Sequence, residues 1–402
     1  MIRHLYLHIP FCVRRCAYCD FTTFATPRGD ARMQAYVSAL LRLLDEARVA
    51  GLVQQLDTAY LGGGTPSFLG PSALGRLVAG VAACAAPRAE LSFEANPDSL
   101  SDELLAAARE AGATRVSVGV QSADDAELAV LARVHTAEQA LERVAAAVAS
   151  GLAVSADLMC ALPGQTPASF GRSLARLVDA GVGHLSVYPL MVEDGTPLAA
   201  RVDAGELEEP SEDDEADYML QAAAFLRGHG FARYEVASYA WPGLACAHNQ
   251  AYWTGRSYLG LGTAAASMMT AAEYACLRAA APGLPPAPPQ AARVRLTCTS
   301  LPDELLAARG LAELAWDAEF LSAREAAAED LMLGTRMSAG ASAAVVERAR
   351  EAIGAQAVDA TLAAVQARGL ATLTEEGSLA PTTRGWLLGN ELYGALWDLA
   401  RA

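Results

Sequence analysis

The first 190 residues alternate short apolar runs with longer stretches that fit helices. Six runs of four to six residues read as buried strands, and this alternation predicts strand-helix units around a parallel sheet. Several expected helices begin at a capping residue or Pro and end near Gly, as with Ser101 and Gly112. The strands are expected to start at Leu5, Thr58, Leu91, Arg115, Ala153 and His184, and the helices to span 31–50, 71–83, 101–111, 136–150 and 167–180.

Beyond residue 190 the pattern changes. An acidic run leads into an expected helix over 212–228, and a Pro-rich stretch from Ala281 indicates an exposed loop. From residue 321 the pattern predicts helices that close on a short hairpin. We therefore expect three parts: a strand-helix domain over 1–190, an extension over 191–320, and a small C-terminal domain over 321–402.

Composition narrows the classes of function. The net charge of -16 argues against a nucleic acid as main partner, because phosphate binding needs clustered Lys and Arg. Neither a basic start followed by a long apolar run nor eighteen consecutive apolar residues occurs, so we expect a cytoplasmic protein without a signal peptide or a membrane span. Five of the eight Cys are scattered, which is typical of reduced thiols rather than a disulfide framework.

The other three cysteines, Cys12, Cys16 and Cys19, fall within eight residues. Thiolates are the ligands that iron-sulfur clusters require, and this spacing lets one loop place a thiolate ligand on each of three irons of a cubane. Phe21 stands where a C-x-C continuation would place a fourth thiol, so the fourth iron would stay open. The alternative from these residues alone is a structural zinc site that His8 completes.

Further candidates follow the other expected strands, and chemistry in parallel barrels collects at such C-terminal strand ends. A Gly-rich stretch, L-G-G-G-T-P, follows the second strand; a tight turn is its plain alternative, and no Lys follows to make a phosphate-binding loop. Glu94 ends the third strand and Asp157 lies in the fifth, where an unpaired charge is costly. Arg133 alone is explained equally well as a helix-end cation.

Taken together, C-x-x-x-C-x-x-C, the preceding Y-L-H-I-P-F and the intact G-G-G-T-P resemble the radical S-adenosylmethionine (SAM) superfamily. More specifically they resemble the family of oxygen-independent coproporphyrinogen III oxidase and the HemW-type haem chaperones. The resemblance implies an α/β fold, a partial (βα)6 TIM-type barrel with a small winged-helix-like C-terminal domain. It also implies a [4Fe-4S] cluster on the three cysteines and S-adenosylmethionine on the open iron. The implied cofactor-binding residues are Tyr6, Tyr18, Gly63, Gly64, Thr65, Glu94, Gln121, Arg133 and Asp157.

The segment H-N-Q-A-Y-W, from His248 to Trp253, resembles a motif of the chaperone branch. It implies haem as a third bound group, with His248 as iron ligand and Tyr252 and Trp253 against the porphyrin. From the residues alone, a structural corner with a hydrogen-bonded His is an equal alternative. Relatives usually read G-L-G-P-G-A-H-S where this chain reads G-L-G-T-A-A-A-S, so a His found in relatives is absent at Ala266.

Two functions follow from the resemblance. One is a haem chaperone that delivers haem to client haemoproteins, respiratory ones included, with a homodimer left open. The other is coproporphyrinogen III dehydrogenase, which converts propionates to vinyl groups. Phe21 in place of a further Cys, the short segment ahead of Cys12, and H-N-Q-A-Y-W favour the chaperone. We therefore expect no coproporphyrinogen dehydrogenase activity.

Overall fold

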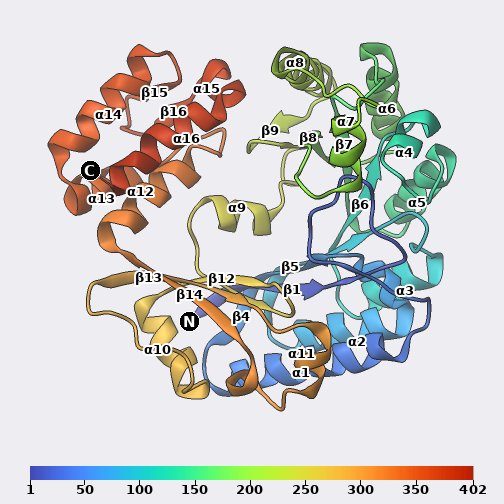
Figure 1. Ribbon diagram of the computed structural model, residues 1–402, viewed down its shortest axis with the longest axis horizontal. Coiled ribbons are helices and arrows are strands. Elements are labelled where there is room, and N and C mark those ends of the chain that lie inside the picture. Colours follow the sequence, from blue (N-terminus) through green and yellow to red (C-terminus); the bar gives the residue numbers. More distant parts are fainter. Residues whose placement is uncertain (402) are drawn as a thin grey trace.

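The computed structural model describes residues 1–401 and centres on one twelve-stranded sheet (Figure 1). Seven adjacent strands within these residues are parallel, which confirms the predicted sheet and adds one strand to it. All six expected strands are present. In spatial order the parallel strands are β11 (Tyr258–Leu261), β1 (Ile2–Ile9), β4 (Val53–Gly63), β5 (Ala85–Ala95), β6 (Arg115–Gln121), β7 (Ala153–Cys160) and β8 (His184–Pro189).

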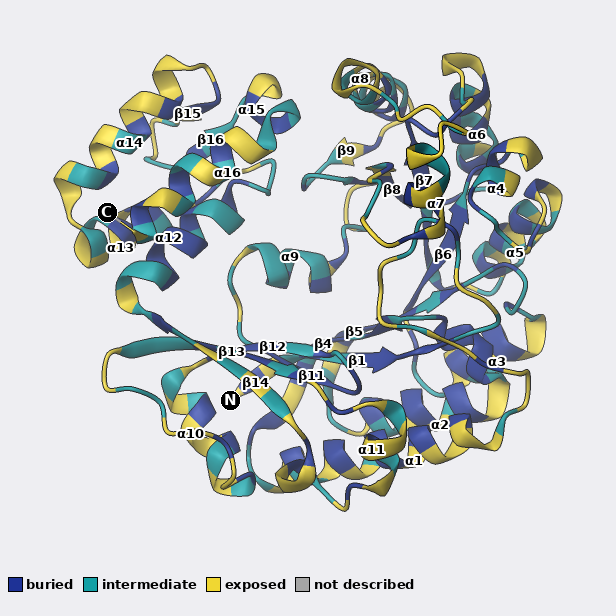
Figure 2. Cartoon of the chain, viewed as in Figure 1, coloured by how far each residue is buried: buried dark blue, intermediate teal, exposed yellow. Residues whose placement is uncertain are grey.

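Helices cover the outer face of these strands and bury their apolar sides against it (Figure 2). The helix over 101–111 begins where the sequence indicated, because the Ser101 hydroxyl accepts a hydrogen bond from the Leu104 amide at 3.2 Å. Ser211 caps the acidic helix in the same way. The helices are α1 (Ala31–Val49), α2 (Pro71–Ala82), α3 (Asp102–Glu110), α4 (Asp125–Val130), α5 (Ala137–Ala149), α6 (Pro167–Asp179), α7 (Pro197–Asp203) and α8 (Glu212–Gly228).

Antiparallel strands extend the sheet at both edges. Next to β8 lie β10 (Ser238–Ala240) and β9 (Ala232–Arg233); beyond β11 lie β12 (Ala266–Thr270), β13 (Ala291–Cys298) and β14 (Trp316–Ser322). The extension over 191–320 therefore shares the sheet of the first part. Its helices are α9 (Ala247–Trp253), α10 (Ala271–Ala280) and α11 (Pro302–Ala307).

The C-terminal part has its own hydrophobic core, which runs from Ala327 to Leu399. It contains five helices and one two-stranded hairpin, in keeping with a small winged-helix-like domain, and α9 lies between it and the sheet (Figure 1). The division at residue 320 stays a prediction. The elements are α12 (Ala323–Gly334), α13 (Ala343–Ile353), α14 (Ala355–Ala367), β15 (Ala371–Leu373), β16 (Leu379–Pro381), α15 (Thr383–Leu387) and α16 (Gly389–Trp397). No helix within residues 1–401 combines the length and apolarity needed to cross a bilayer.

Candidate functional site

A cavity of about 580 Å³ opens where the parallel strands end. Strand side chains alternate between the two faces of a sheet, so every second residue of each strand points inward. Here most of those inward positions are polar, whereas their neighbours pack under the helices. Paired positions such as Glu94 and Ser117 lie side by side on adjacent strands. The strands thus supply a polar wall, which includes Tyr60, Glu94, Ser117, Gly119, Gln121, Ser155, Asp157, His184, Ser186 and Tyr188.

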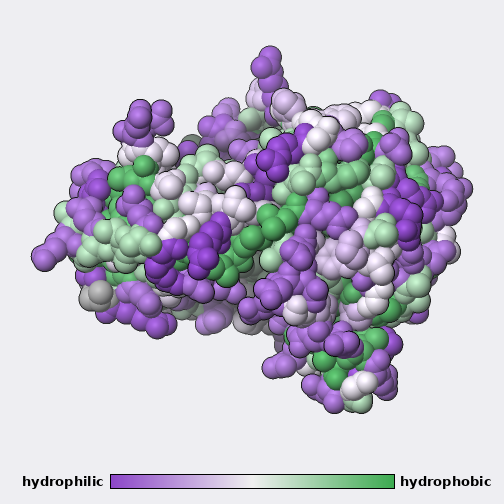
Figure 3. All heavy atoms as spheres, turned by 90° about the horizontal axis from the view of Figure 1, so that it is seen from above, coloured by the Kyte–Doolittle hydropathy of each residue, from purple (hydrophilic) through white to green (hydrophobic). Residues whose placement is uncertain are grey.

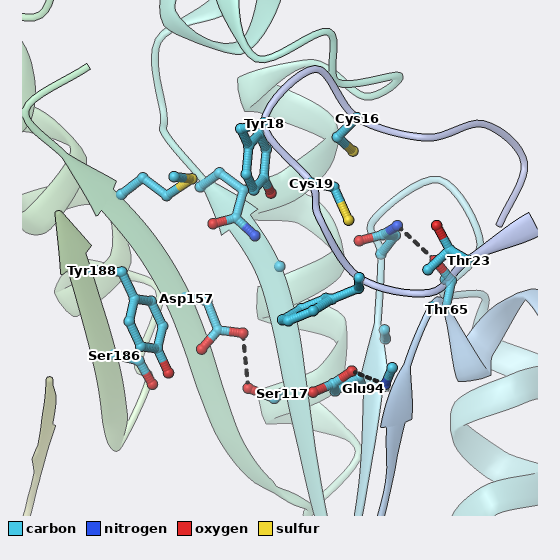
Figure 4. Close-up of a pocket in the computed structure, with 18 of the residues that line it drawn as sticks. Cys16, Tyr18, Cys19, Thr23, Thr65, Glu94, Ser117, Asp157, Ser186 and Tyr188 are labelled. Carbon is cyan, nitrogen blue, oxygen red and sulfur yellow. Dashed lines mark hydrogen bonds between the residues drawn. The ribbon is translucent and has the colours of Figure 1, made fainter. Parts of the chain in front are cut away.

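The loop that carries the three cysteines covers one side of this cavity (Figure 4). Two short parallel strands, β2 (Phe11–Cys12) and β3 (Phe24–Ala25), close its base. The Gly-rich stretch after β4 holds the same base, because the amides of Gly64 and Thr65 donate to the carbonyls of Ile9 and Phe11 at 2.8 and 2.9 Å. The loop is therefore tied to the sheet at both ends while its thiols face the cavity.

Gly63 and Gly64 each make close contacts that fix the Gly-rich stretch. The Gly63 amide donates to Glu94 Oε2 at 3.0 Å. Gly63 also has φ +106°, and a Cβ there would lie 2.4 Å from the His8 ring. A Cβ on Gly64 would meet the Ile9 carbonyl at 2.7 Å. Glycine is needed at both positions so that the Gly-rich stretch can pack closely against the end of β1 and the start of the cysteine loop.

Four hydrogen bonds connect two of the cysteines across the cavity. Cys12 Sγ lies 3.4 Å from Thr65 Oγ1, which accepts from Asn96 Nδ2 at 3.0 Å. Asn96 Oδ1 accepts from Arg133 Nη2 at 2.7 Å, and Arg133 Nη1 donates to Cys16 Sγ at 3.3 Å. This relay, Cys12–Thr65–Asn96–Arg133–Cys16, fixes a guanidinium against one thiol. Arg133 is therefore not a helix-end cation, and it contacts the cysteine loop directly.

Two carboxyl groups face the cavity from the strands. Burial raises the pKa of Glu94 to about 7, partly offset by hydrogen bonds from Tyr60 and the Gly63 amide. Burial likewise raises the pKa of Asp157 to about 6, although Ser186 and Ser117 donate to it. Gln121, at the end of β6, has φ 67°, a strained backbone for a residue other than glycine. Two buried carboxyl groups that have no ion-pair partner within residues 1–401 form a site suited to a cationic ligand.

The two tyrosines of the predicted site lie at different depths. Tyr18 lines the cavity from the cysteine loop, and burial raises its pKa. Tyr6 stacks on Tyr60 but does not line the cavity; its hydroxyl lies 3.0 Å from His8 Nδ1. His8 Nε2 lies 3.0 Å from the Thr22 carbonyl. Tyr6 and His8 thus support the loop from beneath.

His248 is not brought to the cavity. It is 4% exposed and lies in α9, with Nδ1 2.8 Å from the Thr58 hydroxyl and its ring stacked on Tyr60. Burial lowers its pKa to about 3, so the ring is neutral. Its Nε2 has no hydrogen-bond partner within residues 1–401. The prediction that His248 ligates iron stays a prediction. The contacts of His248 are those of the alternative, a buried, hydrogen-bonded histidine with a structural role.

Sequence reasoning missed residues that depend on strand register. Asn96 completes the relay, and only its place directly after β5, in F-E-A-N-P-D, could have indicated it. Glu90 and Arg115 form a buried ion pair at 3.1 Å, and Glu90 accepts from the amides of Ala247 and His248 at the start of α9. These contacts close the floor of the cavity with α9.

The residues present suit a thiolate-held cluster. Cys12, Cys16 and Cys19 all line one cavity, beneath which the glycines leave no room for a side chain. Burial raises the pKa of Cys12 to about 11, and a thiol there ionises when a metal binds it. Within residues 1–401 no three His, Cys, Asp or Glu side chains already converge at metal distance. This is compatible with a cubane, in which each of the three thiolates binds a different iron.

Comparisons with known proteins show what this chain is similar to. The model of the radical SAM superfamily matches residues 6–177. The heme chaperone HemW of Mycobacterium tuberculosis is 42% identical over 265 residues, which cover 65% of this chain and 68% of that protein. HemW of Bacillus subtilis is 29% identical and covers 98% of this chain and 99% of its own. Among solved structures, coproporphyrinogen III oxidase HemN of Escherichia coli matches with a TM-score of 0.75 at 21% identity, over 98% of this chain and 89% of that one.

Proposed function

Because this chain belongs to the HemW family of the radical SAM superfamily, we propose that it is a haem chaperone that binds haem and transfers it to haemoproteins. The similarity to HemW of Mycobacterium tuberculosis carries this proposal, because it reaches 42% identity over 68% of that protein. A second relative, HemW of Bacillus subtilis, aligns over almost its whole length. We further propose that the protein acts in the cytoplasm and that respiratory haemoproteins are among its clients.

In this proposal Cys12, Cys16 and Cys19 hold a [4Fe-4S] cluster, which supplies one-electron chemistry when S-adenosylmethionine is bound. Glu94 and Asp157 offer carboxylates to the cationic amine and sulfonium of that cofactor. Arg133 donates to Cys16 Sγ and so stabilises the thiolate form of one cluster ligand. The remaining implied cofactor-binding residues, Tyr6, Tyr18, Gly63, Gly64, Thr65 and Gln121, line the cavity or support its wall.

The test is haem transfer. Anaerobically reconstituted protein is loaded with haem and mixed with an apo-haemoprotein, and absorbance follows the recovery of the acceptor's spectrum. We expect transfer faster than from free haem, with the cluster intact. A protein that binds no haem under these conditions would not be a chaperone.

Coproporphyrinogen III dehydrogenase is the second candidate, and its support is the shared fold with HemN. At 21% identity this likeness establishes the fold alone. Phe21 occupies the place where we expect a further Cys in the dehydrogenases. Incubation of the loaded protein with S-adenosylmethionine, reductant and coproporphyrinogen III, followed by mass spectrometry, decides between them. Many turnovers to the divinyl product would favour the dehydrogenase.

A further inference from the structure

Several exposed apolar side chains line the cavity. Most of the surface in Figure 3 is hydrophilic, and hydrophobic residues occupy limited patches on it. Of the eleven large apolar side chains that stand exposed within residues 1–401, three line this one cavity: Phe21 at 63%, Met191 at 67% and Tyr188 at 43%. Solitary exposed apolar residues need no explanation, but a group at one opening indicates a binding surface.

The three residues come from two sides of the opening. Phe21 lies two residues after Cys19 in the cysteine loop, whereas Tyr188 is the penultimate residue of β8 and Met191 lies two residues beyond its end. Figure 4 shows Cys19 and Tyr188 on opposite sides of the cavity. Two rings and a thioether therefore flank an opening that leads down to the cysteines. An occupant that covers all three must be broad and apolar.

Two exposed guanidinium groups line the same cavity. Arg14 and Arg15 line it, and both are exposed. Arg14 donates to the carbonyls of Ala132 and Arg133, and Arg15 donates to the carbonyl of Cys19 at 2.8 Å. Bonds to neutral carbonyls leave the charge of a guanidinium uncompensated. Asp20 and Glu193 line the cavity too, so the charge of the rim is mixed, and the two guanidiniums are its donors for an anionic group.

These observations complement the chemistry of haem, which has broad apolar faces and two propionates at one edge. Resting on the proposed function, we propose that haem docks at the cavity mouth against Phe21, Tyr188 and Met191, with its propionates toward Arg14 and Arg15. His248 lies outside the lining of this cavity, buried against Thr58 and Tyr60. Two carboxylates, Asp20 and Glu193, also line the cavity and repel a propionate that comes close to them.

The experiment titrates haem into the anaerobically reconstituted full chain and into surface variants. Met191→Glu places a charge under the porphyrin, and Phe21→Ala removes a ring. Leu220→Glu is the matched control, because Leu220 is 40% exposed on α8 and does not line the cavity. We expect both rim variants to raise the haem Kd at least about tenfold and the control to leave it unchanged. Iron and sulfide content verify that each variant keeps its cluster.

Metal-free protoporphyrin is the second probe, because it has the same faces and propionates but no iron to ligate. We expect Met191→Glu to weaken the binding of protoporphyrin as strongly as the binding of haem. The double variant Arg14→Gln with Arg15→Gln removes both charges. It should weaken the binding of protoporphyrin but not the binding of its dimethyl ester, which lacks the carboxylates. This contrast separates the arginine contacts from the apolar ones.

The outcomes are distinguishable. Weaker binding in both rim variants with an unchanged control supports the site. Wild-type affinity in Met191→Glu and Phe21→Ala overturns it, and so does a loss of porphyrin binding in His248→Ala alone, which would locate haem at α9. If the wild-type protein itself binds no haem, the proposed function fails, independently of which residues form the rim.

Discussion

Asn96 is the residue through which the cavity wall reaches two cysteines at once. Asn96→Ala removes the link between Thr65 and Arg133, so the guanidinium is no longer fixed against Cys16. Loss of an outer partner of a metal ligand typically costs 10-fold to 100-fold in metal affinity. We expect the cluster of this variant to be lost to a chelator about tenfold faster, measured by the decay of its visible absorbance.

The matched control is Ser99→Ala. Ser99 bonds the Ser67 hydroxyl and the main-chain carbonyl of Asn96, but it bonds no side-chain atom of the relay. Its cluster should decay as in the wild type. Equal decay in Asn96→Ala and Ser99→Ala would show that the relay does not stabilise the cluster.

Glu94 and Asp157 make the site sensitive to pH. Burial raises the pKa of Glu94 to about 7 and that of Asp157 to about 6, so both are partly protonated near neutrality. A cation binds their ionised forms, so we expect S-adenosylmethionine to bind more tightly as pH rises from 5.5 to 7.5, about tenfold by calorimetry. In Glu94→Gln with Asp157→Asn the dependence should be lost. A flat profile in the wild type would contradict this.

The same shifts predict how stability changes with pH. A carboxyl group whose pKa is higher folded than unfolded holds its proton in the folded state, so it stabilises the protein fully below its unfolded pKa and less as pH rises through the folded value. Glu94→Gln should therefore increase the free energy of unfolding at pH 8 by about 1–3 kcal/mol and have little effect at pH 4. Denaturant titration at the two values measures the difference. A destabilised variant at pH 8 would contradict the raised pKa.

At the scale of elements, α9 depends on a carboxylate from β5. Glu90 accepts from the first amides of α9 and pairs with Arg115, whose side chain is 5% exposed. Glu90→Gln leaves a buried guanidinium without its counter-charge, which typically costs about 3–5 kcal/mol. We expect a loss of that size in denaturant unfolding. The control is Asp45→Asn, which removes an exposed ion pair with Arg48 and should cost about 1 kcal/mol or less.

The elements also show what the sequence could predict. Runs such as L-Y-L-H-I gave the right strands because both period and length were clear. The seventh parallel strand, Tyr258–Leu261, was missed because four residues beside a Gly-rich turn carry little pattern. The position of His248 could not be predicted either, since it depends on how α9 packs against Thr58 and Tyr60. Motif residues were predictable, whereas the partners that strand register supplies, such as Asn96, were not.

At the scale of the whole molecule, aromatic and cationic side chains join the C-terminal domain to the rest. Arg336 lies over the rings of Trp253 in α9 and Tyr393 in α16, at 5.1 and 4.4 Å. Trp386 donates to the Val236 carbonyl at 2.8 Å. Arg336→Ala should weaken this docking by about 1–2 kcal/mol. Hydrogen exchange should then quicken in α9 and α12 while β4 to β7 stay protected, and uniform protection would exclude such a joint.

The shared opening of the cavity has a consequence for the order of assembly. Phe21 lies only two residues beyond Cys19, so the loop that would contact haem also borders the access route to the cysteines. A porphyrin bound at that rim would block access to the cavity. Iron and sulfur would therefore have to enter the cavity first, and the nucleoside cofactor second. Haem would then bind last and leave first, so it could pass to a client protein without disturbing the cluster or the nucleoside cofactor beneath it.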